Sequence, residues 1–151
     1  MKHSDSIDIE APADQDFAAI SDLPAMERRS PENTGGVWLG GATGPSLGAR
    51  FRGTNSHGED SWATVATVSD FDPPHRFGFN VTYGKLKVAR WVFDVDETPT
   101  GCRVSEHWTD QRGVVLKRYA DTREYDRIEF TRESIRVTLE RLKAELEGSQ
   151  P

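Results

Sequence analysis

The sequence predicts an α+β fold: a curved, seven-stranded antiparallel sheet wrapped around one long C-terminal helix, with two short helices between the first and second strands. Three observations carry this prediction. Six short segments rich in β-branched and aromatic residues follow one another, and their links are short enough to make antiparallel hairpins. Two short helical patterns precede these segments, and one long amphipathic pattern follows them. A curled sheet packed by a single helix leaves space between the layers, so we expect an internal cavity.

The N-terminal part begins with one strand and two helical segments. Ser6–Glu10 alternates weakly between polar and apolar residues and stops at a proline, which indicates a short first strand. Asp14–Ser21 follows with helical spacing, and Leu23–Arg29 resumes the helix after Pro24 interrupts it. The tips of the chain, residues 1–5 and 148–151, are expected to fray.

Six strands are expected next, because each segment is short and is bounded by glycine, proline or other turn-forming residues. Their expected bounds are Val37–Gly41, Ala49–Asn55, Ser61–Asp70, Arg76–Tyr83, Val88–Asp96 and Cys102–Asp110. The glycine-rich link Gly40–Gly48 lacks the consecutive Lys-Ser/Thr pair of a phosphate-binding loop. A hairpin connection is a sufficient explanation for it.

The segment Thr122–Glu147 has the clearest helical pattern in the chain. Its apolar residues form one stripe: Ile128, Ile135, Leu139, Leu142 and Leu146, with Tyr125 nearby. Thr131 and Thr138 flank this stripe and would add hydroxyl groups to a cavity beside it. Phe130 and Val137 lie on nearly the opposite side of the helix, either as isolated exposed residues or as a contact with a second copy or another partner.

The length and the amino-acid composition point to a single domain covering residues 1–151 and to a soluble class of protein. A formal net charge of -6 and dispersed basic residues argue against nucleic acid or an anionic membrane as the main partner. No apolar run reaches the length of a membrane-spanning helix, and the N-terminus has no signal-peptide core, so we expect a cytoplasmic location. The single cysteine, Cys102, fits a reducing compartment.

Strand alternation predicts which side chains face the helix, because residues two apart in a strand share one face of the sheet. Large apolar residues occupy alternate positions in the last three expected strands. The inward-facing sets are Phe77, Phe79, Val81 and Tyr83; Ala89, Trp91, Phe93 and Val95; and Cys102, Val104, Glu106 and Trp108. This choice of face places one carboxylate among aromatic rings.

Glu106 is that carboxylate. An unpaired buried carboxylate is costly, so it either raises its pKa or finds a partner. Two interpretations stay open. Glu106 forms a salt bridge with Arg90, Arg50 or Arg52, or it contacts a ligand and acts as an acid or base.

Three local motifs accompany this order of elements: Ile9-Glu10-Ala11-Pro12-Ala13, Gly48-Ala49-Arg50-Phe51-Arg52-Gly53-Thr54-Asn55 and Val104-Ser105-Glu106-His107-Trp108-Thr109-Asp110. Together they resemble the START-like or SRPBCC superfamily, in its actinobacterial branch, which includes polyketide cyclase/dehydrase-like and lipid-transfer proteins. The resemblance implies a helix-grip fold and places the glycine-rich loop beside the cavity mouth. Members of this fold share no fixed catalytic set, so the resemblance implies a scaffold rather than one activity.

We therefore expect the protein to bind a hydrophobic small molecule, such as a lipid, an aromatic or a polyketide-like metabolite. The residues expected to line its site are Phe51, Trp62, Phe79, Tyr83, Trp91, Phe93, Glu106, Trp108, Thr131 and Ile135. Two alternatives stay open: an aromatase/cyclase-like enzyme that uses Glu106 or Tyr83 in the same cavity, and a protein-interaction domain with a filled core. No catalytic residue or cofactor is assigned, and no metal site is expected because the four histidines share no ligand spacing with Cys102.

Overall fold

The structure is a computed structural model that describes residues 1–120 and 126–148. Within these residues, seven strands form one antiparallel sheet in the order β1-β7-β6-β5-β4-β3-β2. The strands are β1 Lys2–Ile9, β2 Asn33–Trp38, β3 Arg50–His57, β4 Asp60–Asp72, β5 Arg76–Tyr83, β6 Leu86–Thr98 and β7 Gly101–Asp110. The helices are α1 Ala13–Ser21, the 3₁₀ helix η1 Leu23–Arg28, α2 Val114–Ala120 and α3 Arg127–Gly148.

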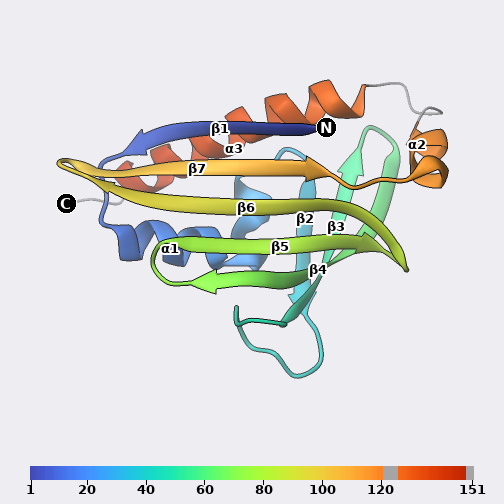
Figure 1. Cartoon of the computed structure of the whole chain (residues 1–151), viewed down its shortest axis with the longest axis horizontal. Helices are drawn as coiled ribbons and strands as arrows, with labels where there is room; N and C mark the ends of the chain where they lie inside the picture. The colour runs from blue at the N-terminus through green and yellow to red at the C-terminus, as the bar shows by residue number, and fades with distance from the viewer. Residues whose placement is uncertain (121–125, 149–151) are drawn as a thin grey trace.

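The helices pack against the sheet at different places (Figure 1). The long helix α3 runs beside β1 and also contacts β7, whereas α1 packs against β5, β6 and β7. The register shifts between Val68 and Asp70 in β4 and between Val81 and Thr82 in β5. Such bulges increase the local twist and help a sheet to curve. The predicted α+β fold, with a curved seven-stranded sheet and two short helices between β1 and β2, is confirmed.

The first strand is longer than predicted. Lys2 pairs with Thr109 and Asp5 pairs with Glu106, so β1 covers the residues that were expected to fray. The prediction for residues 1–5 is wrong because this segment is held by backbone pairing with β7, which the weak alternation of its side chains does not reveal.

The second strand begins earlier than predicted, at Asn33 instead of Val37, and ends at Trp38. Two glycines explain why the pattern was missed, since a strand interior rarely contains them. Gly36 is needed here because a Cβ atom at this position would lie 2.3 Å from the backbone oxygen of Arg52 in β3.

Helix α2 has no counterpart among the predicted elements. It is short and begins with two β-branched residues, Val114 and Val115, which are weak helix formers. The predicted helix Thr122–Glu147 corresponds to α3, whose first turn is capped by Asp126: its carboxylate accepts hydrogen bonds from the backbone N–H groups of Ile128 and Glu129. Residues 122–125, including Tyr125, lie outside the described residues.

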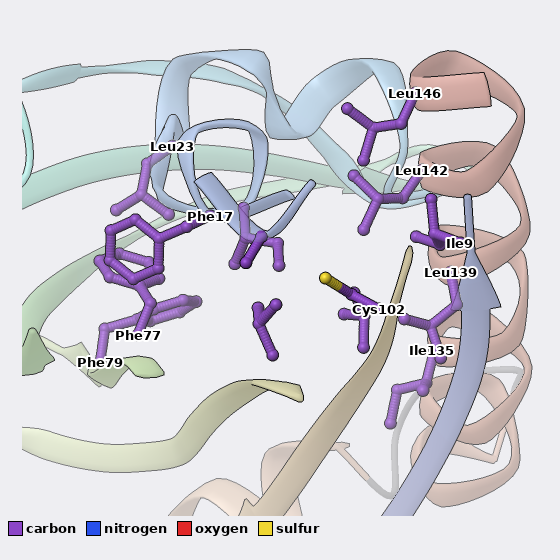
Figure 2. Close-up of a cluster of buried hydrophobic side chains, with 14 of the residues drawn as sticks. Ile9, Phe17, Leu23, Phe77, Phe79, Cys102, Ile135, Leu139, Leu142 and Leu146 are labelled. Carbon is purple, nitrogen blue, oxygen red and sulfur yellow. The ribbon is translucent and has the colours of Figure 1, made fainter. Parts of the chain in front are cut away.

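One end of the space between the sheet and α3 is filled by a dense core, which we call the closed end (Figure 2). Phe17 of α1 meets Phe77 of β5 edge-on, with ring centroids 6.3 Å apart. Leu139 and Leu142 of α3 are fully buried from the other side. The stripe predicted for the long helix therefore supplies one wall of the core.

Phe130 and Val137 of α3 are half-buried, so the first of the two alternatives for them, isolated exposed residues, is wrong. The ring of Phe130 packs edge-on against His57 at the end of β3, with centroids 4.5 Å apart. The start of α3 thus packs against the β3–β4 hairpin.

No helix within the described residues is long and apolar enough to cross a membrane.

Candidate functional site

A cavity of about 280 Å³ extends from the closed end between the sheet and α3. Side chains of β3 to β7, α2 and α3 form its wall, together with residues of η1 and the segment after it. All ten residues predicted to line a site lie on this wall: Phe51, Trp62, Phe79, Tyr83, Trp91, Phe93, Glu106, Trp108, Thr131 and Ile135. That they contact a ligand stays a prediction.

The sheet side of the cavity is a wall of aromatic rings. Phe79 of β5 is paired in register with Trp91 of β6, which is paired with Trp108 of β7. The rings of Trp91 and Trp108 are tilted by 36° with centroids 6.3 Å apart. Because neighbouring strands place these rings side by side, the wall presents a broad apolar surface suited to a flat or elongated apolar molecule.

The helix side of the cavity carries hydroxyl groups next to the apolar stripe. Thr131, Ser134, Ile135 and Thr138 all line the cavity, at spacings of three and four residues that place them on one face of α3. Thr131 is buried, and the Ser134 hydroxyl is buried with no hydrogen-bond partner. Sequence reasoning identified the two threonines and missed Ser134, which lies midway between them.

The mouth of the cavity lies at the end of β5 and beside α2. Two wall residues there are strongly exposed: Tyr83 at 47% and Tyr119 of α2 at 59%. Figure 1 shows α2 beyond the end of β7, away from α1. Residues 40–48, all of them described, contribute nothing to the wall, so the loop expected beside the mouth lies elsewhere. The β2–β3 loop is at the opposite end of β3 from the hairpin near Phe130.

Among the described residues of the cavity wall, three arginines are each held by a carboxylate. The nitrogen–oxygen pairs are Arg29–Glu145 at 2.9 Å, Arg112–Asp110 at 2.9 Å and Arg127–Glu32 at 2.6 Å. Burial by itself would raise the pKa of Asp110, but hydrogen bonds from Arg112 outweigh it and lower that pKa below its usual value. These guanidinium groups are therefore committed to the protein's own acids. None of the three pairs was predicted. Arg29 and Arg127 have partners far away in the chain, and Arg112 lies in the link between β7 and α2, for which no structure was predicted.

Glu106 differs from the other charged residues of the wall that the structure describes, because it has no ionic partner among them. Its side chain is buried, at 5% exposure, and its Oε1 atom has no hydrogen-bond partner. Burial, followed by the negative charge of Asp5, raises the pKa of Glu106 well above its usual range. The neutral carboxylic acid is consequently favoured over the carboxylate.

The first of the two interpretations of Glu106, a salt bridge with Arg90, Arg50 or Arg52, is not what the structure shows. Arg90 instead donates a hydrogen bond of 2.8 Å to Asp70, and Arg50 and Arg52 are exposed. Alternation explains the outcome, because Ala89 is buried towards the core and its neighbour Arg90 points to the other face of the sheet. The prediction that Glu106 faces inward with Val104 and Trp108 is confirmed.

A second buried carboxylate, Asp16 of α1, belongs to the closed end and not to the cavity wall. Neither of its oxygens has a hydrogen-bond partner, and burial raises the pKa of Asp16 to about 6. The Cys102 thiol lies close enough to oppose this rise. Burial, with the neighbouring Asp16, raises the pKa of Cys102 to about 12.

The cavity offers limited chemistry. Glu106 is the one buried acidic group among the described residues of the wall, whereas Tyr83 is at the exposed mouth. A neutral carboxylic acid donates a hydrogen bond or a proton to a ligand oxygen. Residues 1–120 and 126–148 contain no cluster of three or more side chains suited to a metal ion.

Comparison with known proteins gives one family. Residues 1–147 match the family described as polyketide cyclase/dehydrase and lipid transport. The comparison with curated proteins gave no match.

Solved structures of similar shape are numerous, and three illustrate their range. A polyketide-cyclase-like protein of Corynebacterium glutamicum is 26% identical, with a TM-score of 0.60 over 99% of this chain and 95% of that one. A Deinococcus radiodurans protein is 18% identical, with a TM-score of 0.71 over 99% and 100% of the two chains. The di-domain ARO/CYC BexL from the BE-7585A biosynthetic pathway is 19% identical, with a TM-score of 0.73 over 100% of this chain and 51% of BexL.

Proposed function

The chain belongs to the family described as polyketide cyclase/dehydrase and lipid transport, and from this premise we propose that it binds a hydrophobic small molecule between the sheet and α3. The observation that carries the proposal is the cavity of about 280 Å³ walled by Phe79, Trp91 and Trp108. An enclosed apolar space with few polar groups is the usual form of a small-molecule site. A lipid, an aromatic compound or a polyketide-like metabolite fits this description.

An aromatase/cyclase-like enzyme is the second candidate, and Glu106 is the observation that favours it. A carboxylic acid held neutral in an apolar cavity can donate a proton to a ketone oxygen and take one back during ring closure. The ARO/CYC protein BexL shares the fold at 19% identity, and a similarity at this level does not indicate which residues of this chain would be catalytic. The choice between carrier and enzyme therefore depends on turnover of a bound ligand.

A protein-interaction domain with a filled core is disfavoured, because open space lies beside Glu106. The cytoplasmic location, the homodimer, the single domain over residues 1–151 and the actinobacterial type stay predictions.

The proposal is tested by binding of a neutral dye, N-phenyl-1-naphthylamine, to the full chain. We expect a blue shift and a saturable rise in fluorescence, because the dye leaves water for the aromatic wall. Thr138→Phe should weaken binding at least about tenfold by filling the cavity from the helix side, since Thr138 is half-buried on its wall.

The matched control is Val37→Phe, which adds a similar bulk at an exposed position outside the cavity and should leave binding unchanged. Native mass spectrometry of the protein purified from its own host would then identify a retained ligand. Dye binding that is absent, or that both variants retain equally, contradicts the proposal.

A further inference from the structure

The charged groups of the cavity wall leave little for an anionic ligand to bind. Arg29 donates from Nε and Nη2 to Glu145 and from Nη1 to the carbonyl oxygen of Ala19. Arg112 forms two hydrogen bonds with the Asp110 carboxylate, at 2.9 Å each. All the hydrogen-bonding nitrogens of Arg29 are thus in use, and Arg112 is bound in a bidentate pair.

Arg127, the third cavity arginine, is held in the same way. Its Nη1 atom lies 2.6 Å from Glu32, and its guanidinium group lies over the Trp62 ring at 5.6 Å. A ligand carboxylate could recruit one of these arginines only by separating it from its partner. Doing so would leave the displaced carboxylate of the protein without its cation, at a large cost in free energy.

The polar groups of the wall that lack a partner are of another kind. Within the described residues, the buried cavity-lining atoms without one are Glu106 Oε1, on the sheet side, and Ser134 Oγ, on the helix side. The buried carboxyl of Glu106 repels an anion when it is ionised and donates a hydrogen bond when it is neutral. The Ser134 hydroxyl both donates and accepts.

We infer that the cavity selects neutral ligands carrying a ketone or hydroxyl oxygen on an apolar body, and that it discriminates against carboxylates and other organic anions. This inference rests on the proposed function and names the ligand class of the same site. A ketone oxygen accepts from Glu106, and a ligand hydroxyl bonds to Ser134. Free fatty acids and aromatic acids are the excluded classes, because their carboxylate would lose its hydration with no uncommitted cation among the described wall residues.

A panel with one ring system and different polar groups tests this inference. The full chain is titrated at neutral pH, by calorimetry, with naphthalene, 2-acetylnaphthalene, 2-naphthol and 2-naphthoate. The ketone and the naphthol should bind about three- to tenfold more tightly than naphthalene, which is the gain from one buried hydrogen bond. The carboxylate should bind at least about tenfold more weakly than naphthalene.

Variants of Glu106 and Ser134 test whether these two side chains cause the preference for neutral ligands that carry an oxygen. Glu106→Leu, of similar volume, should remove the advantage of 2-acetylnaphthalene over naphthalene, and Glu106→Gln should restore part of it because an amide N–H also donates. Ser134→Ala should lower the affinity for 2-naphthol about threefold. The control is Ser69→Ala, whose hydroxyl bonds to Asp70 away from the cavity wall.

The outcomes separate this inference from the proposed function. Equal affinity for all four compounds, or tightest binding of 2-naphthoate, overturns the selection for neutral ligands and leaves the proposed function standing. Binding of none of the four overturns both. If Glu106→Leu does not fold, the wild-type panel and Ser134→Ala still decide the matter.

Discussion

Aromatic residues are packed differently at the closed end of the structure and around the cavity. Phe77 at the closed end is fully buried and meets Phe17 of α1. Trp91 in the next strand is half-buried and faces open space. Alternating aromatic residues occur at both ends, so alternation alone does not decide whether the space is filled. The difference follows from the helices: at the closed end α1 packs against β5, β6 and β7, whereas around the cavity α3, the short helices η1 and α2 and the segment after η1 leave the space between them and the sheet unfilled.

The two buried carboxylates repeat this comparison. Asp16 is enclosed by packed side chains, and Glu106 borders a cavity. Both have a raised pKa because burial disfavours the charged form. Burying Asp16 therefore lowers the stability of the fold with no evident gain. Burying Glu106 has the same kind of cost, but it leaves a polar group beside the cavity that can form a hydrogen bond with a ligand.

The largest expected effect concerns matched aromatic truncations at the two ends. Phe77→Ala should lower the free energy of unfolding by about 3–5 kcal/mol, because it opens a void in a dense core. Trp91→Ala should cost less than about 2 kcal/mol, since its ring already borders open space and forfeits fewer contacts. Urea unfolding at constant slope measures both values. Equal losses would mean that the two ends are packed alike.

The next effect is a pH dependence that comes from Asp16. Its pKa rises from 3.8 to about 6 on folding, so the folded protein binds this proton more tightly than the unfolded chain does. The resulting stability is present below about pH 4 and is lost as the pH rises through about 6, with a total of about 3 kcal/mol.

Asp16→Asn removes that dependence. The difference in free energy of unfolding between variant and wild type should therefore shift in favour of the variant between pH 4 and pH 7, and then stay level. Thermal or urea melts at a series of pH values measure it. A variant whose pH profile parallels that of the wild type would show that Asp16 does not titrate in this range.

The smallest effect on stability is expected for Glu106→Gln. The Glu106 pKa is raised, so its contribution is likewise lost with increasing pH, and the neutral amide should equal the wild type or exceed it by about 1 kcal/mol at pH 8. The stabilisation by bound 2-acetylnaphthalene should decrease, whereas Asp16→Asn should keep it in full. A large loss of stability with unchanged ligand binding would assign Glu106 to the fold.

Much of the architecture could be predicted because its signals are local. Alternation placed Phe79, Trp91, Glu106 and Trp108 on the cavity side, and the helical stripe identified the packed face of α3. Asp16 also had a local signal that was overlooked, since it lies three residues before Ala19 and four before Ile20 and shares the buried face of α1 with Phe17 and Ile20.

Other features have no local signal. The pairing of β1 with β7 joins residues far apart in the chain, and so do two of the arginine pairs on the described wall, Arg29–Glu145 and Arg127–Glu32. Helix α2 is too short for a periodic pattern to be recognised. Whether the space behind the aromatic wall is filled depends on where helices pack, which side-chain patterns within strands do not record.

The burial of the Cys102 thiol determines how fast this protein reacts with alkylating reagents. It is the single sulfhydryl of the chain, it is 1% exposed, and its raised pKa keeps it protonated at neutral pH. Alkylating reagents attack thiolates, so the folded chain should react only when β7 transiently separates from its neighbours and water reaches the sulfur. At high reagent concentration the rate of labelling becomes the rate of that opening, and at low concentration it reports how often the open form is populated. The labelling kinetics of this one natural side chain therefore report the transient opening of the core, without an added probe.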